Sequence, residues 1–179
     1  MTEIVVWHTI CTMKNQSLTK TSIIMESVKK VASYIAQRYQ KEFGERISEM
    51  KLHKLLYFTQ RESLIQLGEP MFGENFLAWK YGPVIPSIRQ AYALDELRDI
   101  PRASWFDKYQ QVMDFVFKQY APKEAWSLSR LSHGEFAWQN ARRGLLPSDN
   151  GDVQMNIEDI KKDAQRIKIR RYILGKIAK

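Results

Sequence analysis

The sequence predicts a mainly α-helical protein, in which one compact multi-helix domain carries a short β-hairpin or strand around residues 71–84. Three observations support this fold class. Apolar residues recur at helical spacing in several segments of the chain. A short aromatic run between glycines and prolines interrupts these segments. The length of 179 residues and the hydrophobic fraction of 44% suit one core rather than two.

Two regions are expected along the chain. Residues 1–25 show neither a helical nor a strand period and end in a polar stretch, so they are interpreted as an N-terminal appendage. Residues 26–179 are expected to form a single helical domain that ends in a basic helix. The chain has no internal repeat and no linker-like stretch that would divide this domain.

The first two helices are expected directly after the appendage. Apolar residues between 28 and 39 fall at i, i+3, i+4, i+7 and i+11, which predicts a helix running to about Phe43 and ended by Gly44. Ser48 is the expected N-cap of the next helix, which Gly68 stops. One face of that helix is expected to carry Leu52, Leu55, Leu56, Thr59, Leu64 and Leu67.

The short β element is expected in the aromatic run from Phe76 to Tyr81. Along a strand, Trp79 and Tyr81 lie on one face, and Ala78 and Lys80 lie on the other. The pattern favours a core position for Trp79, with the aromatic face covering the helices. Lys80 and Tyr81 are left open between the core and contact with a partner.

A proline begins the next helix. Pro86 has the backbone geometry that suits a first helical turn, and this helix is expected to reach about Leu97. Ser104 and Asp107 have capping-box-like spacing, which predicts the start of a further helix that continues to about Tyr120.

Three helical segments complete the prediction. Pro122 is expected to open a helix that carries Trp126, Leu128 and Leu131 and ends at His133. A short segment from 135 to 143 follows. After a turn-rich loop from 145 to 155, Asn156 and Asp159 are expected to cap a last helix that reaches about Leu174.

Composition excludes several classes of protein. Cys11 is the single cysteine, so neither an internal disulfide nor a cysteine zinc site can form, and we expect a cytoplasmic protein. The apolar stretch near the start is too short to cross a bilayer, and no basic residue precedes it. The net charge of +8 is concentrated at the C-terminus, where residues 151–179 hold eight lysines and arginines against four acidic residues.

Catalytic and metal-binding patterns are weak in this sequence. His53 and His133, together with Glu62 or Glu135, contain the residue types of a metal site or an acid–base pair. The two histidines lie far apart, however, and no zinc-enzyme, phosphate-loop or nucleophile-elbow motif is present. We therefore expect no metal, no cofactor and no enzymatic activity. His133 is interpreted as capping or bracing the helix end before Gly134.

Four blocks of sequence stand in series. They are MKLHKLLYF at 50–58, GEPMF at 68–72, AWKYGPVIPS at 78–87, and LSRLSH at 128–133 followed by Glu135, Trp138 and Ala141-Arg142. This series resembles the Panacea domain, found in SocA-like antitoxins and phage-associated GepA-like proteins, over roughly residues 28–143. The family motif positions are Lys51, Leu52, Lys54, Leu55, Leu56, Tyr57, Trp79, Lys80, Tyr81, Gly82, Pro83, Val84, Pro86, His133 and Trp138.

The resemblance implies a helical domain with a small β element and a role in binding other proteins. It implies an antitoxin that neutralises a cognate protein toxin by direct binding, and it raises the further role of an adaptor that delivers the toxin to a Clp-type protease. The sequence departs from the family at Arg61-Glu62-Ser63, where many relatives have a Gly-Trp-His-like continuation. Residues 1–25 have no recognised counterpart in the family.

The basic C-terminal helix supports more than one interpretation. Its lysines and arginines alternate with isoleucines, and a basic amphipathic helix suits an acidic or apolar groove on a toxin. Clustered cations also suit nucleic-acid phosphates, so a DNA-binding autoregulator of its own operon is the alternative, although no stacking aromatic series or helix-turn-helix accompanies them. A third hypothesis is a phage or prophage accessory protein that interferes with host defence. The expected partner-binding residues are Lys80, Tyr81, Arg142, Arg166, Arg170 and Arg171.

Overall fold

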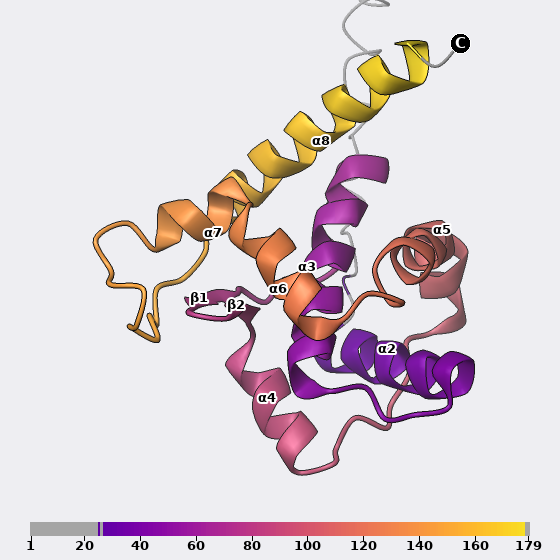
Figure 1. Cartoon of the computed structure of the whole chain (residues 1–179). Helices are drawn as coiled ribbons and strands as arrows, with labels where there is room; N and C mark the ends of the chain where they lie inside the picture. Colours follow the sequence, from indigo (N-terminus) through magenta and orange to yellow (C-terminus); the bar gives the residue numbers. More distant parts are fainter. Residues whose placement is uncertain (1–24, 26, 178–179) are drawn as a thin grey trace, which may run out of the picture.

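The structure is a computed structural model that describes residue 25 and residues 27–177. Within these residues it contains seven α-helices and one two-stranded antiparallel sheet, so the predicted mainly α class with a minor β part is confirmed (Figure 1). The elements are α2 (Val28–Phe43), α3 (Glu49–Gln66), β1 (Leu77–Trp79), β2 (Gly82–Val84), α4 (Pro86–Ala93), α5 (Ala103–Gln119), α6 (Ala125–His133), α7 (Phe136–Ala141) and α8 (Ile157–Ile177). The appendage expected over residues 1–25 lies outside the described residues except for Met25.

Helix α3 lies at the centre of the molecule. Helices α2, α4, α5, α6 and α8 and strand β2 all pack against it (Figure 1). Every residue from Lys51 to Ile65 is therefore buried, including several that are polar or charged. The residues expected on the apolar face are buried as predicted, except Leu67, which is exposed beyond the end of the helix. The other sides of the helix are buried as well, because neighbours cover it all round.

The ends of the first two helices follow local rules. Ser27 Oγ accepts a hydrogen bond from the N–H of Lys29, and α2 ends at Gly44, which has a left-handed backbone. Ser48 Oγ accepts from the N–H of Lys51 and caps α3. The predicted stop at Gly44 and the predicted cap at Ser48 are both confirmed.

The hairpin occurs where it was expected, but its faces are reversed. β1 pairs with β2 in the register Leu77 to Val84, Ala78 to Pro83 and Trp79 to Gly82. Ala78 is fully buried, whereas Trp79 is half-buried, so the core position predicted for Trp79 was wrong. Phe76 is buried just before β1, and the two-residue alternation of an extended chain then places Ala78 on the same inner side.

The later helices differ from prediction at their ends. Helix α4 stops at Ala93 rather than near Leu97, because the chain turns at Asp95, whose φ is +54°. Helix α5 has Arg102 at its N-cap without a side-chain cap, so the predicted capping box was wrong. Helix α6 begins at Ala125, after a turn that contains Pro122, and its Trp126 and Leu131 are exposed.

Helix α8 is longer than expected and has two distinct halves. Asn156 Oδ1 accepts from the N–H of Glu158 and caps the helix as predicted, whereas Asp159 is buried and accepts from Asn140 Nδ2 instead of capping. The first half packs on α3 and α7 through Ile160 and Ala164. The second half projects from the body (Figure 1). In the described part of the chain, no helix is both long and apolar enough to cross a membrane.

Candidate functional site

A cavity of about 360 Å³ lies where the first and third sequence blocks meet. We call it the motif cavity; it is lined by Glu49, Met50, His53, Lys54, Trp79, Lys80, Tyr81, Val84, Arg89 and Asn150. Its walls come from α3, the hairpin, α4 and the loop before α8. Five of these ten lining residues are positions of the family motif, whereas other motif positions, such as Leu55 and Leu56, lie in the hydrophobic core.

Lys54 is the buried cation of this cavity. Its side chain is 1% exposed, and Nζ donates a hydrogen bond to the carbonyl oxygen of Pro83 at 3.1 Å. Burial lowers the pKa of Lys54 to about 7. The hairpin approaches this side chain so closely that a Cβ at residue 82 would lie 2.7 Å from Lys54 Cε and 2.5 Å from Ser132 Oγ, which explains the glycine there.

His53 presents a buried donor without an acceptor. Its Nδ1 accepts from the backbone N–H of Ile85 at 3.4 Å, and burial lowers the pKa of His53 to about 3. The neutral ring therefore carries its proton on Nε2. Nε2 is buried, and no described residue is its hydrogen-bond partner. A ligand that offers an acceptor would satisfy it.

Aromatic and cationic side chains form the rim of the motif cavity. The guanidinium of Arg89 lies 5.0 Å from the centre of the Trp79 ring, and its Nε lies 3.2 Å from Glu49 Oε1. Trp79 Nε1 donates to Asp152 Oδ1 at 2.9 Å. Lys80 Nζ lies 4.8 Å from the Tyr81 ring centre, so both predicted hairpin contact residues stand at the rim.

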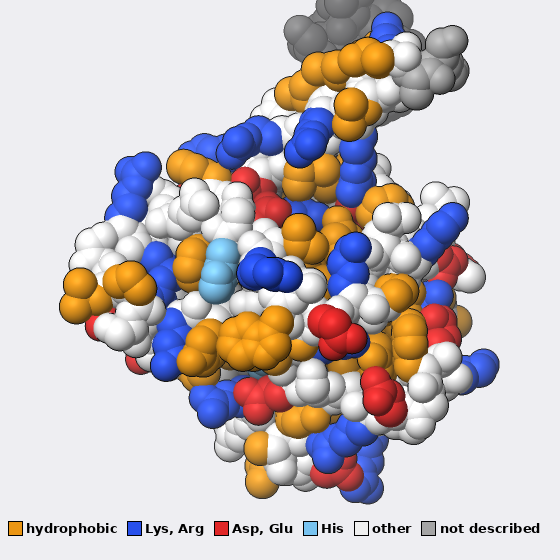
Figure 2. Space-filling view, in the orientation of Figure 1, with side chains coloured by type: hydrophobic (Ala, Val, Ile, Leu, Met, Phe, Trp, Pro, Cys, Tyr) orange, Lys and Arg blue, Asp and Glu red, His pale blue; other side chains and the backbone are white. Residues whose placement is uncertain are grey.

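Tyr81 also belongs to an exposed aromatic pair. Its ring meets the ring of Trp126 edge to face at 5.4 Å between centroids, and both side chains are exposed. Ser129 Oγ donates to the carbonyl oxygen of Tyr81 and fixes the hairpin turn to α6. Figure 2 shows that hydrophobic and basic side chains gather on this face of the molecule.

His133 and Trp138 support the hairpin from behind. Their rings stack with 4.0 Å between centroids, and Trp138 Nε1 donates to the carbonyl oxygen of Trp79 at 3.0 Å. Burial lowers the pKa of His133. Gln139 Nε2 caps the carbonyl oxygen of His133, so the histidine ring braces the junction of α6 and α7 by stacking rather than by capping its own helix.

The histidine and carboxylate groups considered for chemistry do not converge. Glu62 pairs with Arg171, and Glu135 pairs with Arg61, both away from His53. Among the described residues, no group of three histidine, cysteine, aspartate or glutamate side chains is placed to hold a metal ion.

Arg142 stabilises the fold through several backbone contacts. Its guanidinium donates to the carbonyl oxygens of Ala78, Leu146, Asp149 and Asn150 at 2.8–3.2 Å. The side chain is buried and ties the 145–155 loop to β1. The role of Arg142 as a partner contact stays a prediction, and its observed contacts are internal.

The three predicted arginines of α8 have different positions. Arg171 donates to both carboxylate oxygens of Glu62 on α3 and anchors the helix. Arg166 and Arg170 line a shallow cavity of about 310 Å³ together with Glu135 and Asp163. Asp163 itself accepts hydrogen bonds from the backbone N–H groups of residues 136 and 137 and so caps α7.

The outer half of α8, residues 168–177, exposes both large apolar and basic side chains. Exposed large side chains there are Ile169, Tyr172, Ile173, Leu174 and Ile177, and Figure 2 shows hydrophobic side chains along this projecting part. No acidic residue follows Asp163 in the sequence. The predicted alternation of isoleucine and basic residues therefore forms a largely exposed surface.

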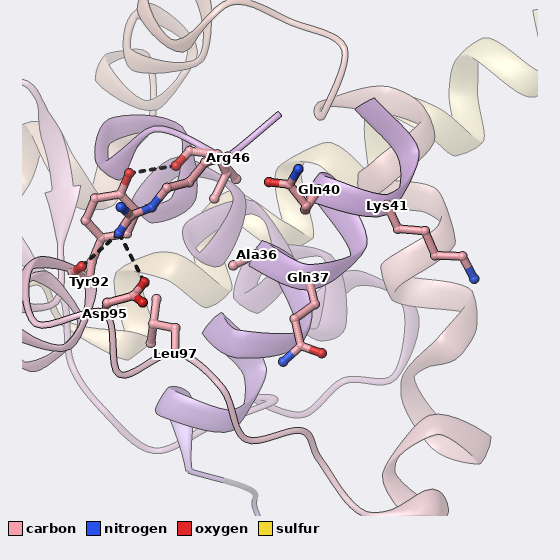
Figure 3. Close-up of a pocket in the computed structure, with 9 residues that line it drawn as sticks. Ala36, Gln37, Gln40, Lys41, Arg46, Tyr92, Asp95 and Leu97 are labelled. Carbon is pink, nitrogen blue, oxygen red and sulfur yellow. Dashed lines mark hydrogen bonds and ion pairs between the residues drawn. The ribbon is translucent and has the colours of Figure 1, made fainter. Parts of the chain in front are cut away.

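A second cavity, of about 420 Å³, lies between α2 and α4, and several of its polar groups on the side of Arg46 and Tyr92 pair with one another (Figure 3). Arg46 donates to the carbonyl oxygen of Tyr92 and lies 3.6 Å from Asp95. The Tyr92 hydroxyl donates to the carbonyl oxygen of Ile47. None of its lining residues belongs to the family motif, so the motif cavity is the better candidate site.

Fold and site define a mainly helical domain with a donor-rich cavity between α3, the hairpin and α4. Residues 52–139, just under half of the chain, match the family described as antitoxin SocA-like, Panacea domain. A relative is antitoxin SocA of Caulobacter vibrioides (strain NA1000 / CB15N), which is 40% identical over 47 residues. That similarity covers 26% of this chain and 25% of the relative, so the chain spans about a quarter of the relative it matches. No solved structure matches the chain.

The matched family is described as that of SocA-like antitoxins. Sequence reasoning missed the orphaned donor of His53 and the part of Arg89 in the rim. The available signal was the pair His53-Lys54 within an otherwise apolar helical block, because polar residues buried in such a block need partners.

Proposed function

We propose that this protein neutralises a toxin by direct binding, and that the outer half of α8 docks into an apolar groove with an acidic rim on that toxin. The observation that supports the proposal is the exposed isoleucine surface of a projecting helix that carries only positive charge beyond Asp163. The matched antitoxin family supplies the class of partner.

The exposed apolar residues of outer α8 follow one side of the helix, as in helices that bind in a groove of a partner protein. Ile169, Ile173 and Ile177 lie four residues apart, so they follow one side of the helix, and Tyr172 lies beside them. Ile173 is 49% exposed and Ile177 is 76% exposed. Covering such a side chain contributes roughly 1.5–3 kcal/mol, which makes a contiguous exposed set a strong indication of a partner.

The charge of this segment selects the chemistry of the partner. Lys168, Arg170 and Lys176 flank the isoleucines, and no acidic residue follows Asp163 in the sequence. A second copy of the same helix would bring like charges together, which is unfavourable. An apolar groove with an acidic rim would complement both the apolar side chains and the positive charges of this segment.

The inner half of α8 must be left intact in any test. Ile160, Asp163 and Ala164 are buried, and Arg171 is tied to Glu62, so deleting the whole helix would damage the fold. The suitable variant is Ile173→Asp combined with Ile177→Asp. Leu94→Asp is the matched control, because Leu94 is an apolar side chain of similar exposure (59%) on another part of the surface.

The test is co-expression with each neighbouring reading frame, scored by rescue of growth and by co-purification. We expect wild-type protein and the Leu94→Asp control to rescue growth from one toxic frame and to co-purify with its product. The double isoleucine variant should lose both. Retained rescue by this variant, with normal folding by circular dichroism, would contradict docking through α8. A variant that lacks residues 2–24 tests whether the N-terminal segment carries the binding instead.

Occlusion of the toxin and delivery of the toxin to a Clp-type protease both begin with this binding step. A chase of toxin abundance after protein synthesis is stopped separates them. Stable toxin in complex indicates occlusion. Toxin that disappears only when both the antitoxin and the protease are present indicates delivery.

DNA binding is the second candidate function, because the cations of outer α8 also suit phosphate groups. Arg166→Ala with Arg170→Ala is the informative pair, since Arg171 is an anchor of the fold. Salt-dependent binding to promoter DNA that is lost in this pair, and kept in the double isoleucine variant, would favour autoregulation. A phage accessory role is tested by the same co-expression with host-defence components in place of the toxin.

A further inference from the structure

We propose that the motif cavity is a binding site for a carboxylate group carried on an apolar or aromatic moiety, with the His53 Nε2–H and the Lys54 ammonium as its donors. This site is separate from the docking surface on α8 and does not depend on the toxin-binding proposal. The carboxylate would come either from a free organic acid or from the C-terminus of a peptide.

The first argument is the unsatisfied donor of His53. Because Nδ1 accepts from the N–H of Ile85, the ring proton lies on Nε2, which is buried without a partner among the described residues. Native proteins rarely leave a buried donor unpaired unless a ligand or water satisfies it. The larger cavity between α2 and α4 has no such atom in its lining.

The second argument is the neighbouring ammonium of Lys54. Its hydrogen bond to the carbonyl oxygen of Pro83 uses one of the three N–H donors. Close packing of Gly82 and Ser132 around the end of the side chain holds Nζ in place. A carboxylate has two oxygens, so one can accept from Lys54 while the other accepts from His53, the adjacent residue of α3.

The rim favours an anion of low charge with an apolar body. Arg89 and Lys80 supply further cations, and the carboxylate of Glu49 is already paired with Arg89. The Trp79 ring, Met50 and Val84 offer apolar surface to the remainder of a ligand. The deep donors are a neutral imidazole and one ammonium, which suit a single negative charge better than a phosphate dianion.

Entry of a ligand requires the rim to open. The side chains of His53 and Lys54 are each 1% exposed, so both lie beneath the resting surface. Arg89 is half-exposed, and its guanidinium contacts Glu49 and the face of Trp79. We expect Arg89 to leave the Trp79 ring and meet the incoming carboxylate at the mouth.

The titratable and charged groups around Lys54 come from several elements. They are His53 on α3, His133 on α6, and, around the cavity, Lys80, Arg89 and Glu49. Burial lowers the pKa of Lys54 to about 7, and a bound anion would raise that pKa. Binding near pH 8 should therefore take up a proton from the buffer.

The probes are phenylacetate, its uncharged analogue phenylacetamide, and inorganic phosphate, titrated calorimetrically into the full-length protein. We expect phenylacetate to bind at least tenfold more tightly than phenylacetamide or phosphate. Lys54→Met and His53→Phe should each weaken phenylacetate binding at least tenfold. Arg46→Met, in the other cavity, should leave it unchanged. Phenylacetate binding no stronger than phenylacetamide binding, or equal binding by Lys54→Met, would overturn the proposal.

A second measurement keeps the proposal testable if the variants fail to fold. Wild-type protein is titrated at pH 8 in buffers of different ionisation enthalpy, and the expected result is net proton uptake when phenylacetate binds. Binding without proton uptake would overturn the assignment to Lys54.

To identify the source of the carboxylate, we compare the binding of a peptide that has a C-terminal phenylalanine with the binding of its C-terminal amide. Tighter binding of the free peptide than of phenylacetate, reduced by Tyr81→Ala at the rim, assigns a peptide C-terminus. Weaker or equal binding of the peptide assigns a free organic acid.

Discussion

Arg171 of α8 donates two hydrogen bonds to Glu62 of α3, with Nη1 2.7 Å from Oε1 and Nη2 3.0 Å from Oε2. Glu62 is fully buried, so this pair joins the projecting helix to the central helix through a charge that water does not reach. Gln66 Nε2 donates to the same carboxylate. The contact is therefore a structural anchor between α8 and α3.

Replacing Arg171 should be costly. Arg171→Ala leaves the buried Glu62 carboxylate without its cation, and we expect the free energy of unfolding to fall by about 3 kcal/mol. Arg166→Ala is the control: Arg166 is largely exposed and lies 3.9 Å from Asp163, so less than about 1 kcal/mol should be lost. Denaturant unfolding measures both variants. Equal losses would show that the Glu62 pair is not an anchor.

Two glycines offer a matched comparison at the hairpin. Gly82→Ala introduces a Cβ that collides with Ser132 Oγ and Lys54 Cε, in addition to the strain of a left-handed φ of +104°. Gly44→Ala has left-handed strain alone, because nothing lies within 4 Å of its Cβ. We expect the free energy of unfolding to fall by about 1 kcal/mol in Gly44→Ala and by at least twice as much in Gly82→Ala. Thermal unfolding of both variants measures the two losses of stability. A smaller loss for Gly82→Ala than for Gly44→Ala would contradict the close approach of Gly82 to Ser132 and Lys54.

The lowered pKa of Lys54 predicts a dependence of stability on pH. The folded-state pKa is about 7, against 10.5 as the usual value, so above pH 7 the unfolded chain binds a proton that the folded chain does not. Stability from this group therefore rises with pH, approaching about 1.4 kcal/mol per pH unit between pH 7.5 and 9.5. Unfolding free energies over this window should show the rise in wild type.

Lys54→Met supplies the comparison for that slope. The variant keeps a side chain of similar length but cannot take up the proton, so its stability should be flatter over the same window. A variant with the wild-type slope would assign the pH dependence to another group.

Arg142 is expected to hold the 145–155 loop. Arg142→Met removes the donor for four carbonyl oxygens, three of which belong to residues 146, 149 and 150 of that loop. Amide hydrogen exchange should accelerate in the loop and in β1, while α2 and α5 stay protected. Unchanged exchange, accompanied by weaker binding of a partner, would instead support the predicted role of Arg142 in an interface.

The sequence predicted elements better than it predicted their surroundings. Gly44 and Ser48 act within one helical turn, so local rules located both helix ends. The all-round burial of α3 depends on contacts with distant residues, such as the pair of Arg61 with Glu135, 74 positions away. No periodicity within one helix reveals such a partner, and the same limit hid the Asp163 cap on α7.

The candidate site was predicted in its residue types but not in its geometry. Family blocks identified Lys54, Trp79 and Tyr81, which share the motif cavity. The predicted strand alternation placed Trp79 on the inner face of β1. The inner face is instead the one that follows from the buried Phe76. Arg89 was absent from every motif and joins the site only because α4 turns back beside the hairpin.

Helix α8 runs without interruption from Ile157 to Ile177, with one half embedded and the other outside. A continuous helix fixes the direction in which its outer side chains point relative to the rest of the protein. Each added residue turns everything beyond it by about 100°. We expect a single alanine inserted between the buried and the projecting part of α8 to turn the exposed isoleucines by that angle relative to the body, while the isoleucines themselves stay unchanged.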